Sequence, residues 1–222
     1  LYGDVVEEFN YETGRLLDVL DELKLSENTL VIYTSDNGPW NQKKYTNNKR
    51  GHPKGSIFWG DSGPLRNGKG SCYEGGYRLP CIVRWPGKVP VGRVSDANFA
   101  TIDFMPTFAR LGGFDIPSDR RIDGVDQTDL LLGKRHSGRE NFYFHEAGVR
   151  QGNWKYLKAN AFFHGYAVEN DREKVEELYD LEADLGERTN LAAKFPQKVA
   201  ELKALMLSIE GRDKLDPKDN NR

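Results

Sequence analysis

Asp36 and Asn37 are the first residues whose types and spacing suggest chemistry. They follow directly on the short apolar and β-branched run TLVIYT at 29–34, and ligands of open α/β sheets gather beyond the carboxyl ends of strands. A carboxylate beside an amide carbonyl offers two hard oxygen donors, which suit Ca²⁺ or Mg²⁺ better than Zn²⁺. The same residue types, followed by Gly38, also favour an ordinary turn. Spacing alone therefore favours the turn over a metal site.

Lys69 is the second candidate, because it lies in the glycine-rich segment SGPLRNGKGS at 62–71. This segment resembles a phosphate loop, but Gly70 stands where the hydroxyl that binds Mg²⁺ is needed, and no phosphate-holding helix is expected to follow. We therefore reject a nucleoside triphosphate site. A lysine held among glycines can still approach a small oxyanion as a point charge. Taken alone, Lys69 is typical of a solvated loop lysine.

The order of three short motifs changes this interpretation. TSDNGP at 34–39 is followed by GKGS at 68–71 and YEGGYRLP at 73–80. This order resembles the sulfatase family of formylglycine-dependent hydrolases, in the alkaline phosphatase superfamily, and the resemblance extends through GNWKY at 152–156 and ELYDL at 177–181. The resemblance implies that Asp36 and Asn37 are Ca²⁺ ligands. It also implies that Lys69 binds the substrate sulfate and acts in catalysis.

The nucleophile of that family is not found in this sequence. The family converts the Cys or Ser of a Cys/Ser-x-Pro-x-Arg motif into formylglycine, and neither Cys72 nor Cys81 stands in such a motif. Ca²⁺ takes about six to eight oxygen ligands, so two side chains do not complete a site. We therefore expect a carboxyl-terminal portion of a sulfatase that is inactive alone. Its formylglycine and remaining Ca²⁺ ligands would lie before Leu1.

Periodicity predicts the elements that position these residues. Apolar residues three and four apart predict amphipathic, packed helices at 4–24 and 99–111 and a closing helix from about Pro196. The runs at 29–34 and 80–85 predict strands of one parallel sheet, buried on both faces, joined by a long surface loop at 41–69. Further along, aromatic-rich runs predict antiparallel strands at 143–146, 154–158 and 177–181.

The expected fold class is therefore α/β. The resemblance implies a partial alkaline-phosphatase-like sheet with flanking helices, followed by a small C-terminal antiparallel sheet and helix. We place the C-terminal portion of the catalytic domain at residues 1–134 and a small α+β subdomain at 135–222, because the segment 134–139 is charged and contains glycine.

Composition excludes several classes of protein. The 222 residues carry a net charge of -2, and Lys and Arg form no basic stripe of the kind that binds nucleic acid. No apolar run is long enough to span a membrane. Two cysteines are too few for a disulfide framework, and we expect both to be packing residues. The first residues lack an initiator Met and a leader, so we expect the chain to begin within a longer protein.

Several other residues are weaker candidates. Three of the four histidines, His52, His145 and His164, fit exposed or packing positions better than ligand positions. Glu74 and Arg78 belong to the family motif, and we expect them to brace the lysine loop by charge pairing. Arg66 is a minor candidate for drawing anions into the cleft.

The expected substrate of the intact protein is a small sulfate ester or a sulfated carbohydrate. By resemblance, its location would be periplasmic, extracellular or lysosomal, and the sequence indicates no oligomeric state. Two alternatives stay open. One is a phosphomonoesterase or phosphodiesterase of the same superfamily, although Asn37 stands where an Asp-His pair would indicate zinc. The other is a non-catalytic domain that binds sulfated glycans through Lys69 and the basic segment 43–54.

Overall fold

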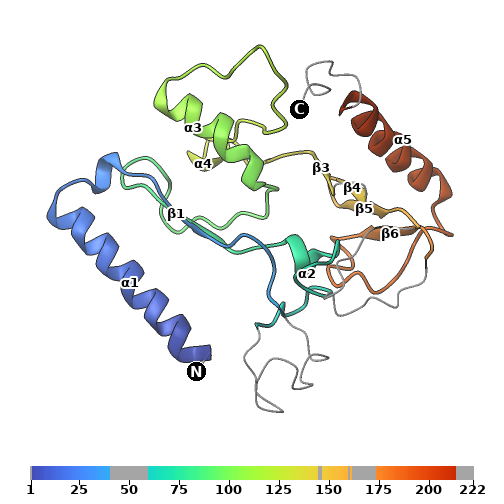
Figure 1. Ribbon diagram of the computed structural model, residues 1–222, viewed down its shortest axis with the longest axis horizontal. Helices are drawn as coiled ribbons and strands as arrows, with labels where there is room; N and C mark the ends of the chain where they lie inside the picture. The colour runs from blue at the N-terminus through green and yellow to red at the C-terminus, as the bar shows by residue number, and fades with distance from the viewer. Residues whose placement is uncertain (1, 41–59, 145–146, 160, 162–173, 214–222) are drawn as a thin grey trace, which may run out of the picture. The chain divides into compact units, whose positions relative to one another are not determined.

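The computed structural model describes residues 2–40, 60–144, 147–159, 161 and 174–213 (Figure 1). The chain forms two compact units that interleave along the sequence. Unit 1 comprises residues 1–2, 35–80 and 141–222, and unit 2 comprises residues 3–34 and 81–140. The domain boundary at residue 134 stays a prediction.

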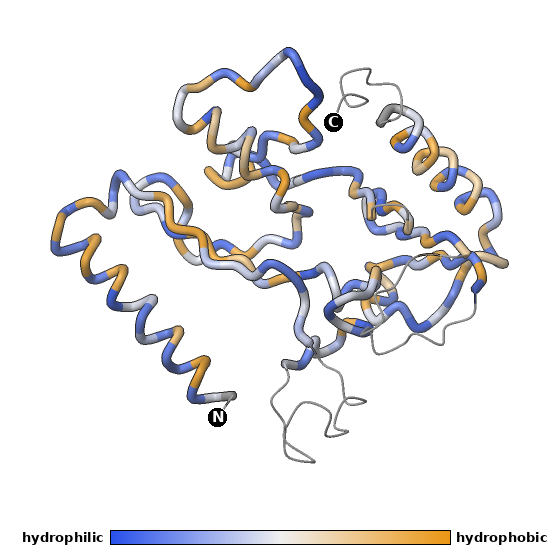
Figure 2. The backbone as a smooth tube through the Cα atoms, viewed as in Figure 1, coloured by the Kyte–Doolittle hydropathy of each residue, from blue (hydrophilic) through white to orange (hydrophobic). Residues whose placement is uncertain are grey.

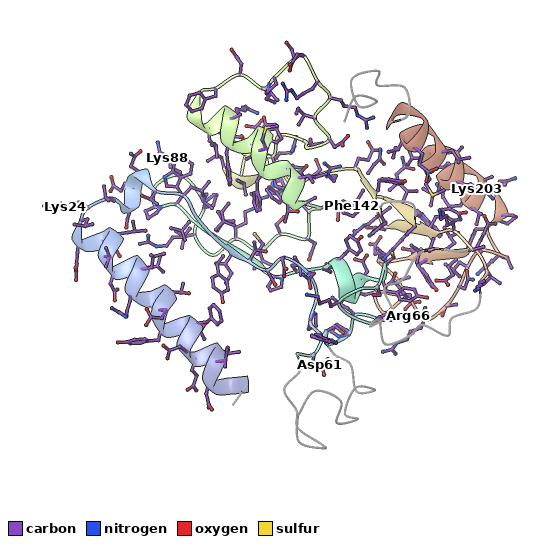
Figure 3. All side chains as sticks on the ribbon, in the orientation of Figure 1. Lys24, Asp61, Arg66, Lys88, Phe142 and Lys203 are labelled. Atoms are coloured by element: carbon purple, nitrogen blue, oxygen red, sulfur yellow. The ribbon has the colours of Figure 1, made fainter. Side chains whose placement is uncertain are left out.

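Unit 1 is built on a four-stranded antiparallel sheet in the order β3-β4-β5-β6. The strands are β3 (Asn141–Tyr143), β4 (Gly148–Gln151), β5 (Trp154–Leu157) and β6 (Glu177–Asp180). The long helix α5 (Pro196–Asp213) packs on β4 and β5. Figure 3 shows the side chains of this helix beside those of the sheet. This core contains Val149, Tyr156, Leu178, Val199, Leu202 and Met206.

A second core covers the other face of the same sheet. Successive side chains of a strand point to opposite faces, so Leu157 and Tyr179 face away from α5. They pack with Cys72 and Tyr73, which precede the short helix α2 (Glu74–Tyr77). The sheet is therefore buried on both faces, and the segment that leads into α2 is part of its packing.

Unit 2 contains the remaining elements. Its helices are α1 (Tyr2–Glu22), α3 (Phe104–Gly112) and α4 (Thr128–Leu131), with 3-10 turns at Ser26–Asn28 and Thr101–Asp103. Strands β1 (Val31–Thr34) and β2 (Cys81–Arg84) pair antiparallel, with Ile32 opposite Val83. Among the described residues of this unit, the buried apolar side chains are Pro106 and Leu130.

The structure confirms the helices expected at 4–24, 99–111 and from Pro196, and the strands expected at 29–34, 80–85, 154–158 and 177–181. The described part of the expected loop, 60–69, contains neither helix nor strand. Two strands of the small sheet differ from expectation. The run predicted at 143–146 forms its strand at β3, slightly earlier, and β4 was not predicted because Gly-Val-Arg-Gln lacks an aromatic or β-branched run.

Three packing expectations are wrong. The pair β1 and β2 is antiparallel, not parallel, and no third strand joins it among the described residues. Tyr33 and Ile82 of this pair are exposed instead of buried. The apolar stripes of α1 and α3 are largely exposed instead of packed, although Figure 2 shows hydrophobic positions recurring along α1. Cys72 is buried as expected, but Cys81 is exposed.

No helix in the described ranges is both long and apolar enough to cross a bilayer.

Candidate functional site

Strand β1 delivers Asp36 and Asn37 two and three residues after its last residue. Asp36 is exposed and Asn37 is half-buried. Ser35 supports the turn, because its hydroxyl donates weakly to the Asp36 carboxylate at 3.5 Å and to the Asn37 carbonyl at 3.3 Å. Both candidate oxygen donors therefore lie at the carboxyl end of the strand.

Lys69 lies in a loop that is fixed by its own polar residues. The Ser62 hydroxyl donates to the carbonyls of Leu65 at 3.0 Å and Asn67 at 2.7 Å. Asn67 has a left-handed backbone, with φ of 60°, which asparagine tolerates better than most residues. Its side-chain oxygen accepts the amide of Gly68 at 2.9 Å. The half-buried lysine thus extends from a constrained loop.

Backbone hydrogen bonds join these two segments to α2. The Lys69 amide donates to the Pro39 carbonyl at 2.9 Å, and the Gly38 amide donates to the Gly76 carbonyl at 2.9 Å. The Gly75 amide in turn donates to the Arg66 carbonyl at 2.9 Å. We call the three segments 36–39, 66–71 and 74–76 the junction. The structure therefore brings Lys69 onto one connected piece of backbone with the Asp36–Asn37 pair, which lies more than thirty positions earlier in the sequence.

The glycines of the junction allow its backbones to touch. A Cβ added to Gly38 would overlap the carbonyl oxygen of Gly75. One added to Gly75 would overlap the carbonyls of Arg66 and Asn67, and one added to Gly76 would overlap that of Ser71. These positions therefore require glycine, because any side chain would clash with the neighbouring backbone. This requirement explains the two glycines that follow Glu74.

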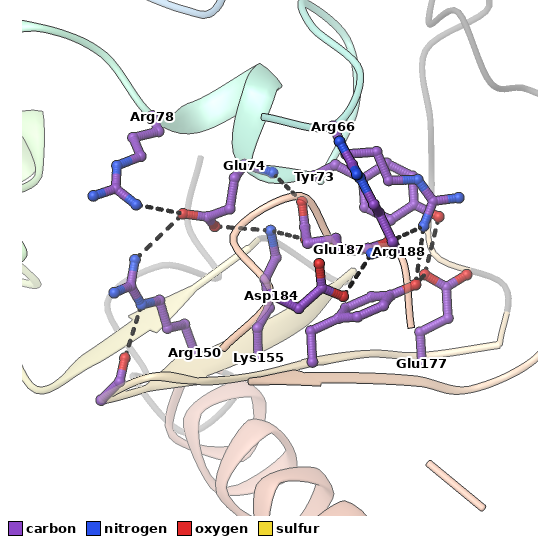
Figure 4. A network of polar contacts seen from close by, with 12 residues as sticks. Arg66, Tyr73, Glu74, Arg78, Arg150, Lys155, Glu177, Asp184, Glu187 and Arg188 are labelled. Atoms are coloured by element: carbon purple, nitrogen blue, oxygen red, sulfur yellow. Dashed lines mark hydrogen bonds and ion pairs between the residues drawn. The ribbon is translucent and has the colours of Figure 1, made fainter. Parts of the chain in front are cut away.

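A buried ion network lies directly beneath the junction (Figure 4). Lys155 of β5 is completely buried, and its ammonium lies 3.0 Å from the Glu74 carboxylate and 2.8 Å from that of Glu187. Two arginines also lie near the Glu74 carboxylate, Arg150 at 3.4 Å and Arg78 at 3.9 Å. The expected pairing of Glu74 with Arg78 is thus present, but the shortest ion pair of Glu74 is with Lys155.

Burial and charge act in opposite directions on this network. Burial raises the pKa of Glu74, but the positive charges of Lys155, Arg150 and Arg78 together lower it by more. The pKa of Glu74 therefore lies below its ordinary value. Burial lowers the pKa of Lys155, but the two carboxylates raise it above its ordinary value. For Glu187 burial prevails over the attraction of Lys155, and its pKa is raised. Lys155 is therefore held as the charged ammonium.

A second buried cluster anchors Arg66 beside this network. The Tyr73 and Tyr179 hydroxyls donate to one Glu177 oxygen at 3.0 and 2.9 Å. Arg66 lies over the Tyr73 ring, 3.8 Å from its centroid, and donates to the Glu187 carbonyl at 2.8 Å. Its contacts hold the loop to the sheet, and the anion-drawing role considered from the sequence stays a prediction.

The donor chemistry of Asp36 and Asn37 fits a hard cation such as Ca²⁺, because both offer oxygen atoms and Asp36 is exposed. Within the described ranges, however, no group of three or more His, Cys, Asp or Glu side chains converges as a metal site. The assignment of Asp36 and Asn37 as two ligands of a Ca²⁺ site stays a prediction.

Sequence reasoning missed Lys155, Arg150 and Glu187. Lys155 was part of the quoted motif GNWKY, but a lysine in a strand normally faces solvent, and only the sheet packing shows that it is buried. His52, His145 and His164, together with the basic segment 43–54, lie outside the described residues.

Comparison with known proteins gives two family matches. The sequence model described as Sulfatase matches residues 1–114. The model described as N-sulphoglucosamine sulphohydrolase, C-terminal, matches residues 67–210. Together they cover residues 1–210, which include the whole junction.

Individual relatives carry sulfatase names. The chain is 34% identical to N-acetylgalactosamine-6-O-sulfatase of Bacteroides thetaiotaomicron over 95% of its own length and 42% of the relative. It is 34% identical to human Arylsulfatase A over 93% of its length and 42% of that protein. It is 41% identical to mouse Steryl-sulfatase over 75% of its length and 25% of that protein. The chain thus spans less than half the length of these relatives.

Solved structures agree with these relatives. A structure described with glycosaminoglycan metabolism by Bacteroides thetaiotaomicron superposes with a TM-score of 0.77 at 34% identity, covering 94% of this chain and 44% of that one. The PsFucS1 sulfatase from Pseudoalteromonas gives a TM-score of 0.73 at 27% identity, covering 92% and 41%. A third structure, in complex with its substrate D-glucosamine-2-N,6-O-disulfate, gives 0.62 at 26% identity, covering 94% and 39%.

Proposed function

Because this chain belongs to the sulfatase family, of which it represents a carboxyl-terminal portion, we propose that the whole protein hydrolyses a sulfate ester. The expected resemblance and the alkaline-phosphatase-like α/β fold class are both confirmed. The observation that carries the proposal is the junction. Its hydrogen bonds connect the segments that carry Lys69 and the Asp36–Asn37 pair, so the proposed anion contact and the two proposed cation ligands lie on one hydrogen-bonded piece of backbone.

Each of the three residues has a distinct part in this proposal. Asp36 and Asn37 would hold Ca²⁺ through their side-chain oxygens. A cation held there would supply positive charge beside the sulfate. Lys69 binds the sulfate and stabilises negative charge on the sulfuryl group or on the leaving oxygen. The formylglycine nucleophile and the remaining Ca²⁺ ligands belong to a part of the protein outside these 222 residues, and this chain alone is inactive.

The proposed substrate is a sulfated carbohydrate or another small sulfate ester. N-acetylgalactosamine-6-O-sulfatase and the structure with a disulfated glucosamine support a sulfated sugar, since both are similar to this chain over more than nine tenths of its length. A periplasmic, extracellular or lysosomal location accompanies this proposal.

The role of Lys69 is tested by Lys69→Ala in the full-length protein, with an aryl sulfate as substrate. Loss of one preorganised group that stabilises transition-state charge lowers kcat by about 10²- to 10³-fold. Lys88→Ala is the matched control, because Lys88 is an exposed loop lysine of unit 2. Unchanged turnover in Lys69→Ala would remove this lysine from the mechanism, and equal losses in both variants would point to a general charge effect.

The metal ligands are tested by Asp36→Ala, with Asp115→Ala, an exposed carboxylate of unit 2, as control. We expect the Ca²⁺ concentration that gives half-maximal turnover to rise for Asp36→Ala and to stay unchanged for Asp115→Ala. The two alternatives give different results. A phosphatase would turn over an aryl phosphate faster than an aryl sulfate, and a non-catalytic glycan-binding domain would bind a sulfated glycan without Ca²⁺.

A further inference from the structure

Lys155 occupies an unusual position for a lysine. It lies on β5, a central strand of the sheet in unit 1, and none of its surface is exposed. Two carboxylates and the face of the Phe144 ring, 4.6 Å from the ammonium, surround its charge. Burying a charge in this way is unfavourable unless the surrounding groups compensate for it.

Glu74 connects this lysine to the junction. Its carboxylate accepts a hydrogen bond from Lys155 at 3.0 Å, and its backbone amide donates to the Glu187 carboxylate at 2.6 Å. Glu74 is therefore held at both its side chain and its backbone. The next two residues are Gly75 and Gly76, which bond to the lysine loop and to the loop that carries Asn37. A shift of Glu74 would thus move both halves of the candidate site together.

Glu187 shows that the surrounding structure imposes this arrangement. It is completely buried and has a left-handed backbone, with φ of 51°, a conformation that is unfavourable for a residue with a Cβ. One of its oxygens faces Lys155 and the other accepts the Glu74 amide. Apolar residues of similar size often stabilise a fold as well as a buried ion cluster does. A fully paired cluster instead fixes one geometry.

We infer that Lys155 is a positioning residue for the sulfatase site: through Glu74 and Glu187 it sets where α2 holds the loops that carry Lys69 and the Asp36–Asn37 pair. This inference rests on the proposed function for its catalytic consequence. Its structural part, the coupling of Lys155 to the junction, stands on the contacts alone.

The test is Lys155→Met in the full-length protein, which keeps the length of the side chain and removes the charge. Residues that orient ligands from outside the coordination shell typically change metal affinity or activity by about 10- to 100-fold. We expect Ca²⁺ affinity, measured by calorimetry, to fall by about tenfold or more. On an aryl sulfate, kcat falls while KM changes less.

Hydrogen exchange provides a readout that does not depend on turnover. The Gly38 and Lys69 amides donate across the junction, so their exchange reports its integrity directly. In Lys155→Met we expect faster exchange in peptides that cover 36–40 and 66–76. Unchanged exchange and unchanged Ca²⁺ affinity in a folded variant would overturn the inference.

Arg139→Met is the matched control for loss of a buried ion pair. Arg139 lies in unit 2, its side chain is 10% exposed, and it contacts the fully buried Asp103 carboxylate at 2.6 Å. This variant should lose stability while Ca²⁺ affinity and exchange in the junction stay those of the parent. Equal effects of both variants on the junction would reduce Lys155 to a general contributor to folding and overturn the inference.

Arg150→Met is the substitute test if Lys155→Met does not fold. Arg150 approaches the same Glu74 carboxylate at 3.4 Å but keeps some exposure, so its loss perturbs the network less. A smaller change in the same readouts supports the inference, and no change in any of them overturns it. If the parent protein has no activity on sulfate esters, the proposed function fails. The exchange measurement then still decides whether Lys155 controls the junction.

Discussion

Unit 1 buries the apolar side chains of its four-stranded sheet on both faces, whereas unit 2 leaves most of its apolar side chains exposed. Tyr156, Leu178 and Leu202 in unit 1 have no exposed surface. In unit 2, Phe9 is 60% exposed and Leu16 is 58% exposed, although both lie on an amphipathic helix. The two units therefore use similar sequence patterns with opposite results.

The difference shows what periodicity can and cannot predict. A repeat of 3.6 residues places apolar side chains on one face of a helix, but it does not specify what covers that face. For α5 the cover is the sheet of unit 1. For α1 the described residues provide no comparable cover. Because similar proteins are more than twice as long as this chain, we expect the full-length protein to bury the α1 face.

The largest effect that tests this comparison is expected from Leu178→Ala. Leu178 lies in the core between the sheet and α5, and truncation of a fully buried leucine costs about 2–5 kcal/mol of unfolding free energy. Leu16→Ala on α1 should change the stability of the 222-residue chain by less than about 0.5 kcal/mol, as is usual for surface positions. Urea unfolding of both variants measures the difference.

The same pair of variants in the full-length protein sharpens the comparison. If another part of the protein covers α1, Leu16→Ala becomes clearly destabilising there while Leu178→Ala keeps its effect. An equal and small effect of Leu16→Ala in both proteins would show that the α1 face stays exposed.

The next effect concerns the junction. In Gly75→Ala the new methyl group would meet the carbonyls of Arg66 and Asn67, and overpacking of this kind costs about 1–3 kcal/mol. Displacement of the Lys69 loop by about 1 Å would lower turnover by about 10²-fold in the full-length protein. Gly211→Ala on α5 is the control, because no atom lies near the new methyl group. Normal activity in Gly75→Ala would show that the site tolerates a larger distance between α2 and the Lys69 loop.

The charged pairs of the two units should respond differently to pH and salt. The folded-state pKa of Glu74 lies below its ordinary value of 4.5, because Lys155, Arg150 and Arg78 outweigh burial. Its contribution to stability is therefore complete above pH 4.5 and is lost as the pH falls below that value through the folded-state pKa. Glu74→Gln should consequently be less stable than the parent at neutral pH, and the difference should shrink in acid.

Salt separates this buried carboxylate from a half-buried one whose partner is exposed. Asp126 in unit 2 contacts Arg110 at 2.7 Å, but the arginine side chain is 52% exposed. Thermal unfolding in about 1 M NaCl, where the screening length is about 3 Å, should remove most of the effect of Asp126→Asn. The effect of Glu74→Gln should persist. Equal sensitivity to salt would mean that the Glu74 network is open to water.

The sequence predicted the helices and strands, and the position of the candidate residues after a strand, better than the packing. The motif at 34–39 placed Asp36 and Asn37 after a strand, and the structure agrees. Lys155 could not be identified in this way, because a single lysine in a strand has no pattern that distinguishes a buried position from an exposed one. The antiparallel pairing of β1 with β2 was missed for a related reason. Strand direction depends on long-range pairing, which a run of apolar residues does not encode.

The smallest expected effect is a gain in stability from Gly14→Ala. Gly14 lies within α1, and no atom outside the helix lies near the position of an added Cβ. Alanine restricts the unfolded chain and favours helix, which stabilises such a site by about 0.5–1 kcal/mol. Urea unfolding of the 222-residue chain should show this gain if α1 unfolds together with the rest of the chain. If helicity measured by circular dichroism rises while the unfolding midpoint stays unchanged, α1 unfolds independently of the rest of the chain. The two units then differ in the cooperativity of their unfolding as well as in their packing.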